Sequence, residues 1–202
     1  MLETFDKNYN LSEERKKILE KYVLLIIKNQ ENLNLIGKST ISDIWTRHII
    51  DSIQILKYLP KEEKNKLLID VGTGAGLPGI VLAIMGRKDV LLCEKSPKKS
   101  NFLKAVLKEC SLNVKIYNCR IEDIVVSNIA IIVSRAYASI KRLILTNIHL
   151  ISKETILVIH KGKKHMQEII EAQKEFAFTF KKFASITSKE GVILKIENVK
   201  RK

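Results

Sequence analysis

The sequence contains the run Asp70-Val71-Gly72-Thr73-Gly74-Ala75-Gly76-Leu77-Pro78-Gly79. The run follows a short apolar segment and opens a stretch with helical spacing. Its glycines allow a sharp turn and let a ligand lie against the main chain. Pro78 suits the first turn of a helix, where its missing N–H is not needed. A strand, a glycine loop and a helix in this order predict a ligand site at the carboxyl end of the strand.

Beyond this loop, short apolar runs alternate with segments of helical spacing. The expected strands are residues 67–71, 90–94, 114–117, 129–133 and 155–159. The expected helices between them are residues 79–85, 97–110, 139–151 and 164–175. This alternation predicts an α/β fold, with a parallel sheet that carries helices on both faces. Two strand-like runs, residues 176–186 and 191–199, have no helix between them and predict an antiparallel pair at one edge.

The first sixty residues have helical spacing without strand-like runs. Ser12-Glu13-Glu14 is expected to begin one helix, and residues 29–39 are expected to form a polar loop. Thr40-Ile41-Ser42-Asp43 matches a capping box and predicts the start of a second helix. The residues expected to line one face of that helix are Ile44, His48, Ile49, Ile53 and Leu56. We therefore expect a helical extension over residues 1–60 and one compact ligand-binding domain over residues 61–202.

The amino-acid composition is typical of a globular protein. The chain has 202 residues, 46% hydrophobic and 29% charged, which is enough for a packed core. Lys plus Arg is 36 and Asp plus Glu is 22, and the resulting net charge of +14 favours a polyanionic partner, although a lysine-rich composition alone gives the same number. No apolar run approaches the roughly 20 residues needed to cross a bilayer. The N-terminus does not resemble a signal peptide.

The cysteines and the other residues that could bind a metal indicate the cellular compartment and whether a metal site is expected. Cys93, Cys110 and Cys119 form no CxxC pair, which fits a reducing cytosol. We therefore expect a cytoplasmic protein that does not associate with membranes. No spacing of His, Cys and Asp suggests a metal site.

The glycine loop is compatible with two adenosine-containing ligands. Gly74-x-Gly76-x-x-Gly79 also satisfies the dinucleotide fingerprint. However, Asp70 lies just before the glycines, where its carboxylate would repel a pyrophosphate but tolerate the cationic amino-acid part of S-adenosylmethionine. Glu94 ends the second predicted strand and can accept both ribose hydroxyls of either ligand. The loop therefore favours a methyltransferase over a dehydrogenase, and Glu94 supports both.

Motifs that the sequence lacks reduce the number of possible methyl acceptors. Cytosine-C5 enzymes need a cysteine nucleophile, commonly after proline, and no proline precedes cysteine here. Enzymes acting on exocyclic amines usually carry Pro-Pro-aromatic after the fourth strand, where this chain has Ser134-Arg135-Ala136-Tyr137-Ala138-Ser139. Guanine N7 has a free lone pair and no proton, so its methylation needs positioning and a suitable field rather than a base. Arg135 is the candidate for holding a base or a carboxylate, and a salt bridge at the strand end is the other interpretation.

Several segments together resemble the bacterial 16S ribosomal RNA guanine-N7 methyltransferases, also known as glucose-inhibited division protein B. The matching segments are Asn32-Leu33-Asn34-Leu35-Ile36, Arg47-His48-Ile49-Ile50-Asp51-Ser52, residues 70–80, residues 134–139 and His160-Lys161-Gly162. They extend over most of the chain and are more specific than a glycine loop alone. The departures are Asn34 and Leu35 for Thr and Ala, Glu94 where Asp is commoner, and His160 before Lys161-Gly162.

The resemblance implies a class I S-adenosylmethionine methyltransferase fold. This is a Rossmann-like, mostly parallel seven-stranded sheet with helices on both faces, here with a short N-terminal helical part. It also implies that the chain methylates guanine N7 in 16S rRNA and meets the small ribosomal subunit. The resemblance assigns Gly72, Leu77, Ile121, Glu122 and Arg135 to the cofactor, S-adenosylmethionine. The loop itself adds Gly74, Gly76 and Glu94, and Arg135 is also the candidate catalytic residue.

The candidate RNA-binding residues are Asn34, Arg47, His48 and Lys161. Arg47 is expected to neutralise a phosphate, and Lys161 lies at the ligand edge of the fifth predicted strand. His48 also lies on the apolar helix face, where a buried structural histidine is the commoner outcome. Two other functions stay open, a small-molecule methyltransferase and a non-catalytic RNA-binding protein with a vestigial cofactor loop. The positive charge argues against a small-molecule methyltransferase. The intact glycines, together with Glu94 and Glu122, argue against a vestigial cofactor loop. We expect the protein to be a monomer.

Overall fold

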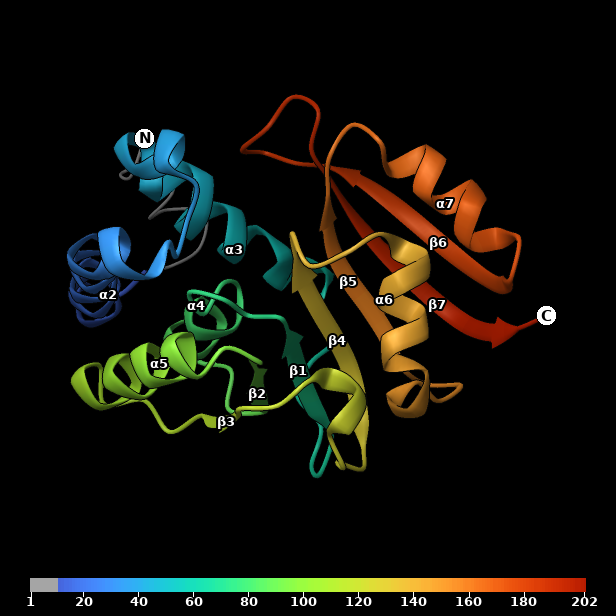
Figure 1. Ribbon diagram of the computed structural model, residues 1–202, viewed down its shortest axis with the longest axis horizontal. Coiled ribbons are helices and arrows are strands. Elements are labelled where there is room, and N and C mark those ends of the chain that lie inside the picture. Colours follow the sequence, from blue (N-terminus) through green and yellow to red (C-terminus); the bar gives the residue numbers. More distant parts are fainter. Residues whose placement is uncertain (1–10) are drawn as a thin grey trace.

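The computed structural model describes residues 11–202, and the N-terminal residues on which the signal-peptide expectation rests lie outside them. The described residues fold around one seven-stranded sheet with the order β3-β2-β1-β4-β5-β7-β6 (Figure 1). The strands are β1 (Leu67–Val71), β2 (Val90–Cys93), β3 (Lys115–Tyr117), β4 (Ile129–Arg135), β5 (Ile156–Lys161), β6 (Phe176–Ala184) and β7 (Val192–Arg201). The strands β1 to β5 are parallel, which confirms the predicted parallel sheet.

The two C-terminal strands, β6 and β7, complete one edge of the sheet, and the spacing of apolar residues in the sequence does not predict their order there. β6 and β7 are antiparallel to each other, as predicted. However, β7 lies between β5 and β6 and pairs antiparallel with β5, so the last strand of the chain is inserted inside the sheet and β6 forms the edge. The loop between β6 and β7 is thereby brought to the same end of the sheet as the carboxyl end of β5.

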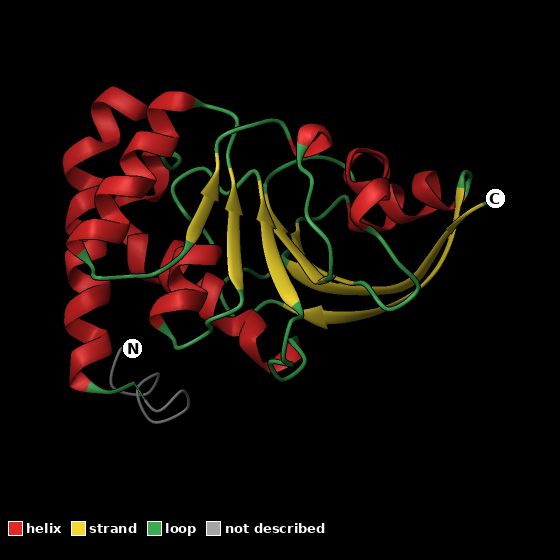
Figure 2. Ribbon diagram, turned by 90° about the horizontal axis from the view of Figure 1, so that it is seen from below, coloured by secondary structure: helices red, strands yellow, loops and turns green. Residues whose placement is uncertain are grey.

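Helices cover both faces of the sheet (Figure 2). They are α2 (Glu13–Leu33), α3 (Asp51–Ile53), α4 (Gly79–Ile84), α5 (Pro97–Glu109), α6 (Ile140–Asn147) and α7 (His165–Gln173). One core lies between the sheet and the helices α2, α4 and α5, and the other lies under α6 and α7. Neighbouring residues of β1 show the expected alternation, because Leu68 enters the first core and Ile69 the second. Within residues 11–202, no helix combines the length and apolarity needed to span a bilayer.

The N-terminal part differs in detail from its prediction. α2 continues to Leu33, past the expected start of the loop at residue 29. Gln30, which was expected in the loop, is buried instead and anchors it. Its side-chain oxygen accepts hydrogen bonds from the Leu35 and Ile36 amides at 3.0 and 2.9 Å, and its nitrogen donates to the Ile36 carbonyl at 2.7 Å. A polar residue in a helix thus fixes the loop that follows.

The predicted capping box is wrong. A 3-10 helix begins at Lys38, and Gly37 is its N-cap, without a side-chain cap. Thr40 lies inside that helix, where its hydroxyl donates to the Gly37 carbonyl at 2.7 Å and contacts His48 Nε2 at 2.6 Å. This 3-10 helix (Lys38–Asp43) is followed by a π-helix (Trp45–Ile50), by α3 and by a second 3-10 helix (Gln54–Tyr58). Residues 38–58 are called the helical run below. The expected buried face is confirmed for Ile44, His48, Ile49 and Ile53, and Leu56 is partly buried.

One hydrogen bond joins α2 to the glycine loop. The Tyr22 hydroxyl donates to the Ala75 carbonyl at 2.8 Å, and the Tyr22 side chain is fully buried. Apolar residues of α2 and of the helical run share a single core with β1 and α4. The helical part is therefore packed against the element that carries the loop. The division into domains at residue 60 stays a prediction.

Replacing Tyr22 with Phe should destabilise the protein by about 1–3 kcal/mol, because the buried Ala75 carbonyl loses its donor. Urea unfolding followed by circular dichroism measures this change. Tyr58→Phe is the matched control, since the Tyr58 ring stacks on Phe183 with centroids 4.2 Å apart and its hydroxyl makes no hydrogen bond within residues 11–202. Equal stability losses in the two variants would contradict the role given to the Tyr22 hydroxyl.

Candidate functional site

A cavity of about 800 Å³ lies at the carboxyl ends of β1, β4 and β5. Its walls come from the glycine loop, the helical run, the segment after β4, the end of β5 and the β6–β7 loop. The lining residues used below are Asn34, Arg47, His48, Asp51, Gly72, Gly74, Leu77, Lys99, Arg135, Tyr137, His160, Lys161, Gly162, Ser185, Thr187 and Ser188. A cavity therefore lies at the sheet edge where the sequence predicts the ligand site.

The glycines of the loop have different roles. Gly72 and Gly74 have positive φ angles of 65° and 60° and both line the cavity. A Cβ atom on Gly72 would collide with the ring of Tyr137, whereas one on Gly74 would meet nothing closer than the Gly72 carbonyl at 3.8 Å. Gly76 faces the core, because a Cβ there would lie 2.5 Å from Ile80 Cδ1. Gly74 is thus the glycine that leaves room beside the main chain, whereas Gly72 allows the close approach of Tyr137 and Gly76 allows close packing in the core.

Asp70 holds the loop and does not face the cavity. Its Oδ2 atom accepts hydrogen bonds from the Gly79 amide at 2.7 Å and the Thr73 hydroxyl at 2.5 Å. Its side chain is fully buried, and this burial raises the pKa of the carboxyl to about 6. The sequence argument placed this carboxylate beside the ligand, and the structure corrects it. Gly79 begins α4, so Asp70 satisfies an N–H at a helix start that has no partner within the helix.

Glu94 lies beside the loop, at the end of the neighbouring strand. Its Oε2 atom accepts a hydrogen bond from the Gly74 amide at 2.9 Å, and its Oε1 atom accepts one from the Ser96 amide at 2.7 Å. Each carboxylate oxygen keeps a second lone pair for a further donor. This acceptor, next to a glycine main chain, fits the paired hydroxyls of a ribose.

Ile121 and Glu122 lie one strand further along. They belong to a short 3-10 helix (Ile121–Asp123) after β3, in which Ile121 is buried and Glu122 is exposed. Neither lines the cavity. Because β1, β2 and β3 are neighbours, the glycine loop, Glu94 and Glu122 follow the carboxyl ends of three adjacent strands. That row suits an elongated ligand with an amino-acid part, a ribose and a base.

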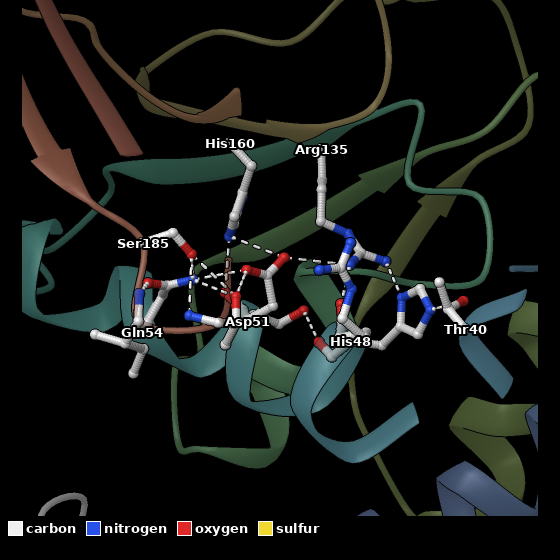
Figure 3. A network of polar contacts seen from close by, with 11 residues as sticks. Thr40, His48, Asp51, Gln54, Arg135, His160 and Ser185 are labelled. Atoms are coloured by element: carbon white, nitrogen blue, oxygen red, sulfur yellow. Dashed lines mark hydrogen bonds and ion pairs between the residues drawn. The ribbon is translucent and has the colours of Figure 1, made fainter. Parts of the chain in front are cut away.

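Arg135 ends β4 and enters the cavity, where three acceptors from the helical run hold it (Figure 3). Its Nη1 donates to the Arg47 carbonyl at 2.9 Å and pairs with Asp51 Oδ2 at 3.3 Å. Its Nη2 lies 2.7 Å from His48 Nδ1. A guanidinium only donates, so His48 Nδ1 accepts and its proton sits on Nε2, which donates to Thr40. Of the two interpretations that the sequence left open for Arg135, the structure shows the salt bridge at the strand end, and the contact with a base or a carboxylate stays a prediction.

His48 is therefore a neutral acceptor. Its burial lowers the pKa of the imidazole to about 4, and the positive charge of Arg135 acts in the same direction. The buried structural role that the sequence allowed for His48 is the one found. A direct contact between His48 and RNA stays a prediction.

The other RNA-binding candidates divide into two groups. Asn34 and Arg47 are exposed and line the cavity, so both are accessible to a large ligand. Lys161 instead turns inward, where its ammonium pairs with Glu168 Oε2 at 2.7 Å and donates to the Ala138 carbonyl. Glu168 also accepts a hydrogen bond from the Ile140 amide at 3.0 Å. Lys161 thus supports the segment after β4, and its contact with RNA stays a prediction.

Sequence reasoning missed a second set of polar residues at the cavity. Asp51 and Gln54, three residues apart in the helical run, bind Thr187 and Ser185 of the β6–β7 loop. His160 at the end of β5 contacts the Asp51 carbonyl with Nε2 at 2.7 Å. Polar residues at helical spacing beside buried Ile53 were the available signal, but their partners lie more than a hundred positions away in the sequence.

The strand order defines a class I S-adenosylmethionine-dependent methyltransferase. The glycine loop, Glu94 and Glu122, which together form the cofactor row at the ends of β1 to β3, agree with this class. Solved structures share this fold. The ribosomal protein L11 methylase from Lactobacillus delbrueckii subsp. bulgaricus has a TM-score of 0.61 at 15% identity and covers 75% of this chain and 78% of its own. The glycopeptide N-methyltransferase MtfA complexed with S-adenosylmethionine has a TM-score of 0.60 at 9% identity and covers 74% and 93%.

Sequence comparisons identify the family. The family model for rRNA small subunit methyltransferase G matches residues 15–197. The ribosomal RNA small subunit methyltransferase G of Rickettsia rickettsii (strain Sheila Smith) is 36% identical over 181 residues, 90% of this chain and 93% of that protein. The protein of the same name from Rhodospirillum rubrum is 33% identical over 199 residues, 98% of each chain. The chain belongs to the rRNA small subunit methyltransferase G family.

We predict that His48 stays neutral from pH 8 down to about pH 5, since its pKa in the folded protein is about 4. Its ordinary value is 6.5, so the unfolded state binds the proton first and stability falls as the pH drops from 6.5 towards 4. NMR titration of the imidazole protons, assigned with His48→Asn, measures the midpoint. A midpoint of about 6 or higher would contradict the acceptor role.

Proposed function

We propose that this chain transfers the methyl group of S-adenosylmethionine to N7 of a guanine in 16S rRNA, acting on the small ribosomal subunit. The observation that carries the proposal is a single cavity that joins the glycine loop of an rRNA methyltransferase family member to exposed cationic residues. Guanine N7 offers an in-plane lone pair and carries no proton. The protein therefore has to align donor and acceptor, and no general base is required.

The residues present fit the cofactor. A Cβ atom at Gly74 would meet nothing closer than 3.8 Å, so the open main chain there would hold the amino-acid part of the cofactor. Glu94 would accept the ribose hydroxyls, and Ile121 and Glu122 would hold the adenine. When bound, the cofactor supplies an electrophilic methyl group. Arg135 is the proposed catalytic residue, and it would hold a carboxylate or a base oxygen through its guanidinium.

RNA would approach over the cationic rim of the cavity. Arg47 and Lys99 line the cavity. Exposed Lys38, Lys163 and Lys189 directly follow the lining residues Gly37, Gly162 and Ser188. Contacts of this kind with phosphates supply affinity that is independent of sequence. We further propose that Asn34 lies close to the RNA and that the protein acts as a cytoplasmic monomer, whose residues 1–60 are a helical extension.

Purified protein, labelled S-adenosylmethionine and small subunits from a strain lacking this methyltransferase should yield label at guanine N7 of 16S rRNA. Mass mapping of nuclease fragments locates the modified base. Subunits from the parent strain, already methylated, are the control and should take up little label. Label on a small molecule, on another base or on another RNA would reject the proposal.

Gly74→Asp tests the cofactor loop, with Gly74→Asn as the matched control. Both side chains tolerate the positive φ better than most, but only Asp adds a negative charge beside Glu94, whose Oε2 atom is 2.9 Å from the Gly74 amide. We expect calorimetry to show S-adenosylhomocysteine binding at least ~tenfold weaker in Gly74→Asp than in Gly74→Asn, about 1.4 kcal/mol. Wild-type protein that does not bind S-adenosylhomocysteine would instead support the vestigial loop.

A further inference from the structure

Three segments far apart in the sequence converge on Asp51, as Figure 3 shows. Its Oδ2 atom pairs with Arg135 of β4 at 3.3 Å. Its Oδ1 atom accepts hydrogen bonds from Thr187 of the β6–β7 loop at 2.5 Å and from Gln54 at 2.7 Å. Its main-chain carbonyl is 2.7 Å from Nε2 of His160, on β5. One carboxylate thus faces Arg135 with one oxygen and the loop with the other.

Asp51 is the charged member of the set that holds Arg135. The other two acceptors, the Arg47 carbonyl and His48, are neutral. Within residues 11–202, Asp51 is the only carboxylate in an ion pair with Arg135. The side chains of Arg135 and Asp51 are 16% and 15% exposed, so solvent only partly screens the pair. Removing this charge is expected to loosen the guanidinium.

The same carboxylate docks the β6–β7 loop. Besides the Thr187 bond, Gln54 accepts a hydrogen bond from the Ile186 amide at 3.0 Å and contacts the Ser185 hydroxyl at 3.2 Å. Gln54 is fully buried and itself donates to Asp51. Ser185, Thr187 and Ser188 line the cavity, and exposed Lys189 follows them. Asp51 and Gln54 therefore hold the loop at the wall of the cavity.

We infer that Asp51 is a positioning residue that couples the orientation of Arg135 to the docking of the β6–β7 loop against the RNA substrate. The inference rests on the proposed function, because it assigns the loop side of the cavity to RNA. Through Thr187, contact between RNA and the loop is transmitted to the guanidinium beside the cofactor row. Misplacement of reacting groups by about 1 Å costs on the order of a hundredfold in rate, so this coupling acts on the methyl-transfer rate.

Thr187→Val is the informative variant, because it preserves shape, removes the bond between the loop and Asp51 and leaves the Asp51–Arg135 pair intact. The contacts of the Thr187 hydroxyl with Gln54 at 3.4 Å and Ser185 at 3.0 Å are lost as well, whereas the bonds of Gln54 with Ser185 and Ile186 remain. We expect the maximal methylation rate on small subunits to fall ~tenfold or more, with S-adenosylhomocysteine affinity within about twofold of wild type. Thr187→Ser should restore the rate to within about threefold, since it returns the hydroxyl. Thr179→Val is the matched control on exposed β6, where the hydroxyl contacts the Glu197 carbonyl at 3.3 Å.

Asp51→Asn completes a double-mutant cycle. If both oxygens act in one unit, the rate of the Asp51→Asn, Thr187→Val double variant should equal that of Asp51→Asn, about a hundredfold below wild type. Rate losses that multiply would show independent roles and overturn the inference. A wild-type rate in Thr187→Val, or a loss matched by Thr179→Val, would overturn it as well.

A readout that needs no activity separates this inference from the proposed function. The Arg135 Nε–H signal in NMR should shift in Thr187→Val and stay in place in Thr179→Val. If wild-type protein fails to methylate small subunits but the signal shifts, the coupling stands and the substrate assignment fails. If wild-type protein methylates 16S rRNA and neither rate nor signal responds to Thr187→Val, the coupling fails and the proposed function stands.

Discussion

The buried carboxylate of Asp70 sets the geometry on which the rest of the site depends. By accepting hydrogen bonds from the Gly79 amide and the Thr73 hydroxyl, it ties the last residues of β1 to the first residue of α4 and so fixes the loop between them. A charge buried this deeply costs free energy unless donors surround it, and here the raised pKa records that cost. The two donors to Oδ2 reduce that cost, and the loop that they hold lines the cavity with Gly72 and Gly74. A ligand is thereby met by a surface that needs little rearrangement.

The helical part preceding β1 contributes residues to the cavity wall and hydrogen bonds to the glycine loop. Tyr22 of α2 bonds the loop from one side, and Gln30 shapes the segment at Asn34 that forms part of the cavity wall. The helical run then supplies the acceptors that hold Arg135. The helices before β1 thus form one wall of the cavity, to which Arg47, His48 and Asp51 belong.

The sequence predicted those features that local spacing encodes. Alternation of apolar runs gave the strands of the parallel sheet, and the glycine run gave the place of the site. Spacing cannot report where a side chain points, and so it did not reveal that the Lys161 ammonium pairs with Glu168. It also cannot pair distant residues: Asp51 and Thr187 are 136 positions apart, and only insertion of β7 between β5 and β6 brings the loop back to Asp51. The capping-box error has a similar cause, because Gly37 starts the helix earlier and Thr40 is used to bond His48.

The ionisable groups around Arg135 suit a reaction that moves no proton from its acceptor. His48 is held neutral by burial and by the adjacent guanidinium, and the pKa of His160 is likewise lowered by burial. Asp51 is committed to Arg135 and Thr187, and His48 Nδ1 is committed to Arg135, so neither of these two groups is free to act as a base near neutral pH. An acceptor that had to lose a proton before attack would find no partner among them, whereas guanine N7 attacks with its own lone pair. What these residues supply is fixed charge and fixed direction, and alignment of this kind is the main contribution that a protein can make to such a transfer.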